Sequence, residues 1–189
     1  NSPEDASKYI SYASGSKYSK GYTFAVEAPK KEIPLFEVIL KKDTIINGDK
    51  NATFTIIPKR KVNQLSLYAK DGTVFNSLSF NGEEMPLNNA SSDAEQKIKS
   101  KELVRYYVTE KDSLEVSYSI SADQPVSFTV LEYSYDLLDN QLFSINNRPE
   151  HMMPKPFVVT DAVVVKKTID INSLKLIKKD SVNDNLIIK

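Results

Sequence analysis

Residues 113–130 have the sequence SLEVSYSISADQPVSFTV, which carries the clearest structural pattern of the chain. Apolar side chains occupy every second position in two runs of this stretch: Leu114, Val116, Tyr118 and Ile120, then Val126, Phe128 and Val130. Polar side chains, mostly serine, fill the positions between them. Such strict alternation is typical of strands with one face in a core and the other in water. The stretch therefore predicts half-buried β-strands.

Similar strand-like patterns extend on both sides of this stretch. We expect further strands at 22–26, 36–40, 53–57, 64–69, 73–80, 103–108, 157–159, 163–171 and 174–177. About eleven short strands with minimal helix predict an all-β fold, a two-sheet antiparallel sandwich of jelly-roll or immunoglobulin-like type. The predicted interior consists of Leu65, Leu67, Leu114, Val116, Ile120, Val126, Phe128, Val130, Val163 and Val165.

The glycines indicate where strands turn. Three of the five follow Asn or Asp, at Asn47-Gly48, Asp71-Gly72 and Asn81-Gly82. These dipeptides tolerate the positive φ that a type I′ hairpin turn requires. We expect the clearest hairpin at Asp71-Gly72, because its register matches apolar with apolar residues. The expected partners are Ala69 with Val74, Leu65 with Leu78, and Tyr68 with Phe75.

The length of 189 residues predicts one domain with an appendage. We expect residues 22–189 to form the sandwich and residues 1–21, which are polar and Tyr/Ser/Lys-rich, to be an arm packing on it or leading into it. Residues 88–102 predict a polar loop with one or two helical turns. No apolar run approaches the length of a membrane span. Because no signal-peptide pattern opens the chain, we expect a processed or excised N-terminus.

Charge and composition exclude several functional classes. Lys plus Arg and Asp plus Glu both number 25, and this balance argues against a nucleic-acid partner or a polybasic membrane surface. With no Cys and a single His, the chain can build neither a thiol site nor a His-rich metal centre. We therefore expect no cofactor in this chain.

No catalytic motif is present, and the candidate groups have simpler interpretations. His151 is more often a loop histidine bonded to backbone than a catalytic base. The carboxylate pairs Glu83-Glu84 and Asp136/Asp139 are more often solvated turn residues than a glycosidase pair, which must face each other across a cleft. We expect no enzymatic activity, neither peptidase nor hydrolase, from this chain.

The aromatic residues leave two interpretations open. Tyr106 and Tyr107 are adjacent in a predicted strand, so one ring faces the core and the other faces solvent. Together with Tyr135, they are candidate exposed aromatics that could form a sugar-binding platform. The alternative is that most of the ten tyrosines pack in or on the core.

Residues 148–154 form the candidate interaction loop. Pro149, Pro154 and Pro156 each restrict φ and the preceding residue, which predicts a stiff crossing segment. We expect Arg148 to bond backbone carbonyls or a carboxylate such as Asp161. At least one of Met152 and Met153 is expected to plug the end of the sandwich. The alternative is an interaction surface with His151 and a Met exposed as contacts.

The last third of the chain resembles a known family. Its motifs follow in order: the strand 126–133, Ser134-Tyr135-Asp136-Leu137-Leu138, the segment 147–154 and Thr160-Asp161-Ala162-Val163. This order is similar to the C-terminal extracytoplasmic region of membrane-anchored di-zinc aminopeptidases, the vacuolar-membrane-protease-like branch of metallopeptidase family twenty-eight. The chain departs from the family at Asp136, where Gly is common, at Ala162, where Ser is common, and in having no Trp.

The resemblance implies a non-catalytic accessory domain with a structural, substrate-recognition or regulatory role. It implies an extracytoplasmic location, periplasmic or on the cell surface, tethered to the membrane in the full-length protein, and the Lys-, Asn- and Ile-rich composition suits a bacterial source. The partners would be the catalytic and transmembrane parts of its own full-length chain, with a peptide or glycan as ligand. Zinc would belong to the missing catalytic domain. The alternative function is a carbohydrate-binding or adhesin-type surface module.

Overall fold

The chain divides into two compact units, Asn1–Glu32 and Ile33–Lys189. The first unit contains an antiparallel pair of two-residue strands, β1 (Ile10–Ser11) and β2 (Phe24–Ala25). All further elements that the structure describes belong to the second unit. The computed structural model describes residues 10–11, 24–25, 31–86, 102–109, 112–153 and 159–176.

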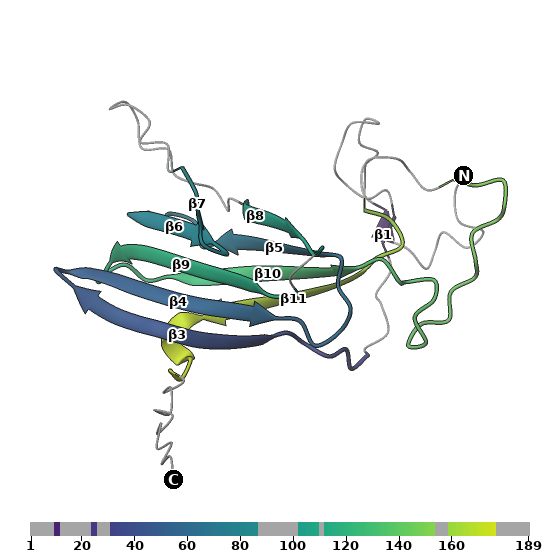
Figure 1. The fold of residues 1–189 in the computed structure, drawn as a ribbon. Helices are drawn as coiled ribbons and strands as arrows, with labels where there is room; N and C mark the ends of the chain where they lie inside the picture. The colour runs from purple at the N-terminus through teal and green to yellow at the C-terminus, as the bar shows by residue number, and fades with distance from the viewer. Residues whose placement is uncertain are drawn as a thin grey trace, which may run out of the picture. The chain divides into compact units, whose positions relative to one another are not determined.

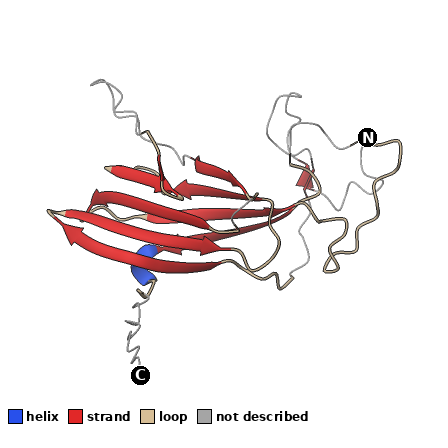
Figure 2. Cartoon of the chain, viewed as in Figure 1, coloured by secondary structure: helices blue, strands red, loops and turns tan. Residues whose placement is uncertain are grey.

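The second unit is a two-sheet antiparallel β-sandwich (Figure 1). One sheet has five strands in the order β3-β4-β9-β6-β7, and the other has four in the order β11-β10-β5-β8. The five-stranded sheet consists of β3 (Glu37–Ile46), β4 (Asp49–Ile57), β9 (Leu114–Ser121), β6 (Ser77–Phe80) and β7 (Glu83–Glu84). The four-stranded sheet consists of β11 (Val163–Asp170), β10 (Ser127–Ser134), β5 (Gln64–Ala69) and β8 (Glu102–Tyr107). A single turn of 3-10 helix, η2 (Ile171–Ser173), follows β11 (Figure 2).

The two sheets contain nine strands, fewer than the eleven or so that the sequence predicts. Of the expected strand at 22–26 the structure describes only Phe24 and Ala25, which form β2 in the other unit. Of the expected strand at 174–177 the structure describes residues 174–176, which contribute one parallel bridge between Leu40 and Leu176. Most of the expected strand at 157–159 lies outside the described residues, and β7 is an additional strand that the pattern does not predict.

Two of the three predicted hairpin turns form as expected. Asn47 and Gly48 join β3 to β4 with φ values of 53° and 86°. Asn81 and Gly82 join β6 to β7 with φ values of 51° and 89°. Positive φ at both central residues is the signature of a type I′ turn, whose twist matches that of the flanking strands.

The hairpin predicted at Asp71-Gly72 is wrong. β5 pairs with β10 and β8, whereas β6 lies in the other sheet beside β9. Of the two turn residues only Gly72 has a positive φ, 82°, and the N–H of Thr73 donates to the carbonyl of Lys70 at 3.2 Å. The turn thus carries the chain from one sheet to the other. Leu65 and Leu78, expected to pair across strands, instead join the same core from opposite sheets.

The core agrees with the predicted interior. All ten predicted residues are buried, and none is more than 9% exposed. Phe128 on β10 lies between the sheets, with its ring centroid 5.2 Å from that of Phe54 and 5.4 Å from that of Tyr118. These two partners come from the opposite sheet, on β4 and β9. The period-2 pattern therefore identifies the buried face of each strand.

Several sequence predictions fall wholly or largely outside the described residues. Apart from β1, nothing is described of the expected arm at 1–21. The polar loop predicted at 88–102 is undescribed up to residue 101, and Glu102 already begins β8.

Candidate functional site

Tyrosines gather on the outer face of the four-stranded sheet. Tyr107 on β8 is the register partner of Gln64 on β5, which in turn pairs with Tyr133 on β10. Tyr68 lies on the same side of β5 as Gln64, because side chains of a strand alternate between faces. The hydroxyl of Tyr135 donates to Oε1 of Gln64 at 3.2 Å, which brings its ring over the same face. We call Tyr68, Tyr107, Tyr133 and Tyr135 the tyrosine face.

A continuous hydrogen-bond network holds the polar groups of this face. The Oε1 of Gln64 accepts from Tyr135, and the Nε2 of Gln64 donates to Oγ of Ser66 at 3.1 Å. Ser66 donates in turn to Oε1 of Glu102 at 2.8 Å. Arg105 completes the network with two bonds to Glu102, from Nε at 3.0 Å and from Nη2 at 2.7 Å. The network fixes these side chains in place before any ligand arrives.

The electrostatics of the face follow from this network. Burial acts to raise the pKa of Glu102, but hydrogen bonds from Arg105, Ser66 and Tyr68 outweigh it and lower the pKa. Burial, followed by the nearby charge of Glu102, raises the pKa of Tyr68. Burial, followed by the neighbouring Tyr107, raises the pKa of Tyr135. At neutral pH the face thus presents a charged Arg105–Glu102 pair beside the neutral phenols of Tyr68 and Tyr135.

The sequence-predicted aromatic candidates divide between the two sides of the sheet. Tyr107 is 56% exposed and Tyr135 is 46% exposed, and both belong to the tyrosine face. Tyr106 is half-buried and packs against the core, so it is not an exposed aromatic. Tyr68 and Tyr133 were not singled out from the sequence. The alternation of β5 and β10 places them outward, but their proximity to Tyr107 depends on strand order.

The candidate interaction loop is tied to the start of β11. Arg148 forms an ion pair with Asp161 through Nη2 and Oδ2. The carbonyl of Asp161 also accepts from the N–H of Leu137 at 3.1 Å, so Asp161 connects both ends of the β10–β11 segment. Asp161 has a φ of 54°, a conformation that Asp tolerates better than most residues. The expected bond between Arg148 and Asp161 is therefore present.

The expected methionine plug is wrong. Met152 is 45% exposed and Met153 is 87% exposed, and His151 is exposed beside them. The N–H of Met152 bonds the carbonyl of Pro149 at 2.8 Å, which closes a turn without bringing the side chain into the core. The buried core cluster instead takes its side chains from the strands and from residues beside them such as Phe36, Val62 and Ile171.

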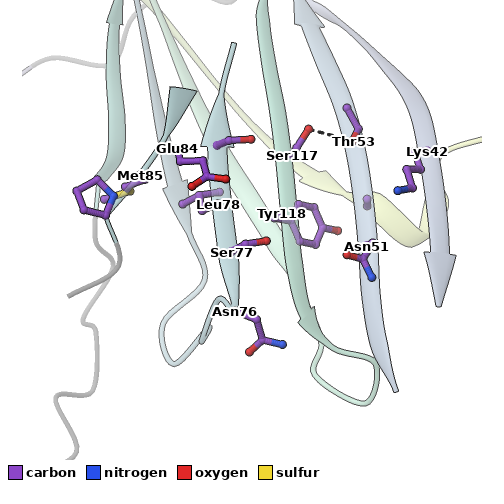
Figure 3. A pocket seen from close by; sticks show the side chains of 13 residues that line it. Lys42, Asn51, Thr53, Asn76, Ser77, Leu78, Glu84, Met85, Ser117 and Tyr118 are labelled. Carbon is purple, nitrogen blue, oxygen red and sulfur yellow. Dashed lines mark hydrogen bonds between the residues drawn. The ribbon is translucent and has the colours of Figure 1, made fainter. Parts of the chain in front are cut away.

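A polar hollow of about 460 Å³ opens on the outer face of the five-stranded sheet (Figure 3). Its floor is made of small side chains, including Thr53 on β4, Ser117 on β9, and Ser77 and Ser79 on β6. Thr53 and Ser117 share a hydrogen bond of 2.9 Å between their hydroxyls. Longer side chains, Lys42 on β3 and Glu84 on β7, stand at opposite sides of the sheet. The hollow exists because short side chains in the middle strands are flanked by long ones at the edges.

Sequence reasoning missed this hollow as a site. The serines that alternate with the apolar residues of 113–120 were recognised only as the solvent side of a strand. A signal was present, since Ser77 and Ser79 show the same alternation around Leu78. It could not be used, because β6 and β9 become neighbours only after the chain crosses between the sheets.

A carboxyl group is buried inside the sandwich. Glu132 on β10 is fully buried, and neither carboxylate oxygen has a hydrogen-bond partner. Burial raises the pKa of Glu132, while the nearby Arg60 acts in the opposite direction. The expected carboxylate pairs lie elsewhere: Glu83 and Glu84 are exposed on β7, and Asp136 accepts from Nδ2 of Asn140 at 3.0 Å.

The described residues include no group of three or more His, Asp or Glu side chains that could hold a metal ion. No helix among them is long and apolar enough to cross a membrane. Comparisons with protein-family models, with curated proteins and with solved structures found no match for this chain.

Proposed function

We propose that this chain is a non-catalytic recognition domain that binds a glycan on the tyrosine face. The observation that carries the proposal is the exposure of Tyr107 and Tyr135 above the bonded network of Gln64, Ser66, Glu102 and Arg105. A pyranose ring has apolar C–H faces and a polar rim, and it is complementary to a surface of aromatic rings interspersed with fixed donors and acceptors. The proposed face offers both, because the rings of Tyr107 and Tyr135 and the guanidinium of Arg105 are exposed, while Gln64 and Ser66 are buried and hold the exposed groups in place.

The network adds specificity to the stacking surface. Arg105 uses two of its N–H groups on Glu102, and a guanidinium has five, so further donors are available to a ligand. Because the acceptors are already held by intramolecular bonds, a ligand has less side-chain ordering to impose. A face built on one side of a sheet suits an extended oligosaccharide better than a small molecule that needs an enclosed cavity.

The test is binding of soluble oligosaccharides such as cellohexaose, xylohexaose and chitohexaose, measured by calorimetry. Tyr107→Ala is expected to weaken binding about three- to tenfold, the range for one aromatic contact, whereas Tyr107→Phe keeps the ring and most of the affinity. Ile45→Ala serves as the matched control, because Ile45 is 67% exposed on the other sheet. Absence of binding by every oligosaccharide, or equal losses in Tyr107→Ala and Ile45→Ala, would reject the glycan proposal.

A second candidate, an accessory domain of a membrane-tethered extracytoplasmic zinc aminopeptidase-like protein, is favoured by the β10–β11 segment. Besides Met152 and Met153, this segment exposes Ile145 at 45% and Leu142 at 38%. Several exposed apolar side chains on one segment are typical of a contact surface. The Arg148–Asp161 pair holds the segment in position for such a contact with the catalytic or transmembrane part of the same protein.

Hydrogen exchange can test this second candidate. Amides of residues 142–153 are expected to exchange more slowly in the full-length protein than in the isolated chain, because the contact would cover them. Amides of the β3–β4 hairpin at Asn47 and Gly48 provide the internal control. Equal exchange of 142–153 in both samples would remove the accessory interpretation of this loop without affecting the glycan proposal.

A further inference from the structure

The hollow of the five-stranded sheet is built on a single row of register partners. Lys42 on β3 pairs with Thr53 on β4, and Thr53 pairs with Ser117 on β9. Ser117 pairs with Ser79 on β6, and Ser79 pairs with Glu84 on β7. All five residues line the hollow (Figure 3). The row therefore crosses the whole sheet, with a cation at one end, a carboxylate at the other and three hydroxyls between them.

The two end charges are not neutralised within the sheet. Lys41, next to Lys42, forms an ion pair with Glu115 at 2.6 Å, and Lys50 lies 3.5 Å from Asp43. By contrast, the side chains of Lys42 and Glu84 form neither an ion pair nor a hydrogen bond in the part of the chain that the structure describes. The hollow thus combines a polar floor with two opposite charges that are free to meet a ligand.

We propose that this hollow is a second binding site, and that it takes a short peptide with both termini free. The peptide carboxylate would lie at Lys42 and its ammonium group at Glu84. The backbone N–H and C=O groups between them would exchange hydrogen bonds with the hydroxyls of Thr53, Ser117 and Ser79. The site lies on the sheet opposite the tyrosine face and does not depend on it.

The spacing of the row limits the length of the peptide. Neighbouring strands lie about 4.8 Å apart, so the four steps from Lys42 to Glu84 span about 19 Å between backbones. The two long end side chains reach inward and shorten the distance between charges. At about 3.4 Å per residue, an extended peptide of roughly three to five residues fits this interval. Met85 and Pro86, which also line the hollow, would contact its side chains.

The test titrates the ¹⁵N-labelled full chain with tetraalanine and follows the amide shifts of Thr53, Ser79 and Ser117. Tetraalanine with free termini is expected to shift these amides at millimolar concentration. N-acetyl-tetraalanine and tetraalanine amide are each expected to bind about two- to fivefold more weakly, the range for one exposed charge contact.

Two variants test the proposed partner of each peptide terminus, Glu84 for the ammonium group and Lys42 for the carboxylate. Glu84→Gln is expected to weaken binding of free tetraalanine about two- to fivefold. N-acetylation of the peptide should then cause no additional loss of affinity in this variant, because its ammonium group has already lost its partner. Lys42→Met is expected to weaken binding of free tetraalanine by a similar factor, and C-terminal amidation should then cause no additional loss of affinity in this variant. Glu83→Gln and Lys41→Met are matched controls, because both residues are neighbours in sequence that do not line the hollow, and they should leave all affinities unchanged.

Three outcomes would overturn the proposal. The first is no shift of the three amides with any free peptide at millimolar concentration. The second is equal affinity of free and blocked peptides, or an acetylation penalty that persists in Glu84→Gln. The third is a shift of the same amides by maltotetraose that Lys42→Met and Glu84→Gln leave unchanged, which would assign the hollow to a neutral glycan instead.

Discussion

Glu132 Oε2 lies 3.9 Å from Arg60 Nε inside the sandwich, and neither atom forms a hydrogen bond. The guanidinium is anchored instead to the backbone, since Nη2 of Arg60 donates to the carbonyl of Glu132 at 3.4 Å. A buried carboxylate that is not hydrogen-bonded is costly, so burial raises the pKa of Glu132 while Arg60 acts to lower it. The free energy of unfolding therefore depends on the protonation of Glu132.

Stability should therefore fall as pH rises above the ordinary carboxyl pKa. In that range Glu132 keeps its proton in the folded chain and has lost it in the unfolded chain, so the unfolded state binds fewer protons. The loss continues until pH passes the raised pKa of folded Glu132, with a slope of at most about 1.4 kcal/mol per pH unit for one proton. Urea unfolding of the parent and of Glu132→Gln across this range measures the difference.

The parent is expected to lose stability relative to Glu132→Gln with rising pH. Arg60→Met should extend that loss to higher pH, because the opposing positive charge is gone. If the free energies of unfolding of the parent and Glu132→Gln run parallel at all pH values, Glu132 does not titrate with a raised pKa.

Phe128→Ala should destabilise the sandwich by about 3–5 kcal/mol, because a fully buried aromatic ring leaves a cavity between the sheets. The lost contacts include Phe54 and Tyr118 from the opposite sheet and Phe75, whose ring centroid lies 6.2 Å away. Urea denaturation gives the free energy of unfolding. Val74→Ala is a suitable control at 63% exposure, and a Phe128→Ala effect as small as this control would contradict the packing described.

Arg148→Ala and Met153→Ala should behave differently. Arg148 loses a half-exposed ion pair with Asp161, which is expected to cost up to about 1 kcal/mol after solvent screening. Met153 is 87% exposed, so its truncation should change the free energy of unfolding by less than about 0.5 kcal/mol. Urea midpoints of both variants decide the point. A Met153→Ala loss equal to that of Arg148→Ala would restore the packing role for the methionine.

Gly48→Ala should destabilise by about 1 kcal/mol through its backbone alone. Gly48 has a φ of 86°, and no atom lies within 4 Å of the position that a Cβ would take. The cost is therefore the strain of a left-handed conformation and not a steric clash. Gly48→Asn should cost less, because Asn tolerates positive φ better. Thermal unfolding that ranks the alanine variant at or above the asparagine variant would exclude this explanation.

The sequence predicts which face of each strand is buried, but it does not predict which strands pair with one another. The alternation alone predicts that Leu114, Val116 and Phe128 are buried, as they are in the structure. A single period-2 pattern is enough to assign a side chain to the core face or the solvent face of its strand. Asp71-Gly72 shows the limit. A two-residue turn signal is the same whether the chain returns along its own sheet or crosses to the other, and the choice depends on β10, almost sixty residues later in the chain.

The same limit explains which parts of the candidate sites the sequence predicts and which it does not. The Arg148–Asp161 contact was predictable because the five donors of a planar guanidinium suit bridging two segments, and Asp161 supplies a carboxylate on the second one. The row from Lys42 to Glu84 was not, because its members come from five strands whose order no local pattern encodes. Exposure of Met153 was missed since an apolar side chain between prolines is compatible with either a core or a contact surface.

The crossing at Asp71-Gly72 also sets the order in which the molecule can assemble. The β3–β4 hairpin is local and can close as soon as its residues are available, but β5 finds its partners only in β8 and β10. β6 pairs at once with the two-residue β7, but it gains its longer partner only when β9 is made. A chain emerging from the ribosome would therefore leave β5 unpaired until β8 (Glu102–Tyr107) has been made, and would leave β6 with only β7 as a partner until β9 (Leu114–Ser121) has been made. Over that interval the apolar side chains of Leu65, Leu67 and Leu78 lack the core that buries them. Long-range pairing of this kind makes folding slow and the growing chain dependent on protection from aggregation.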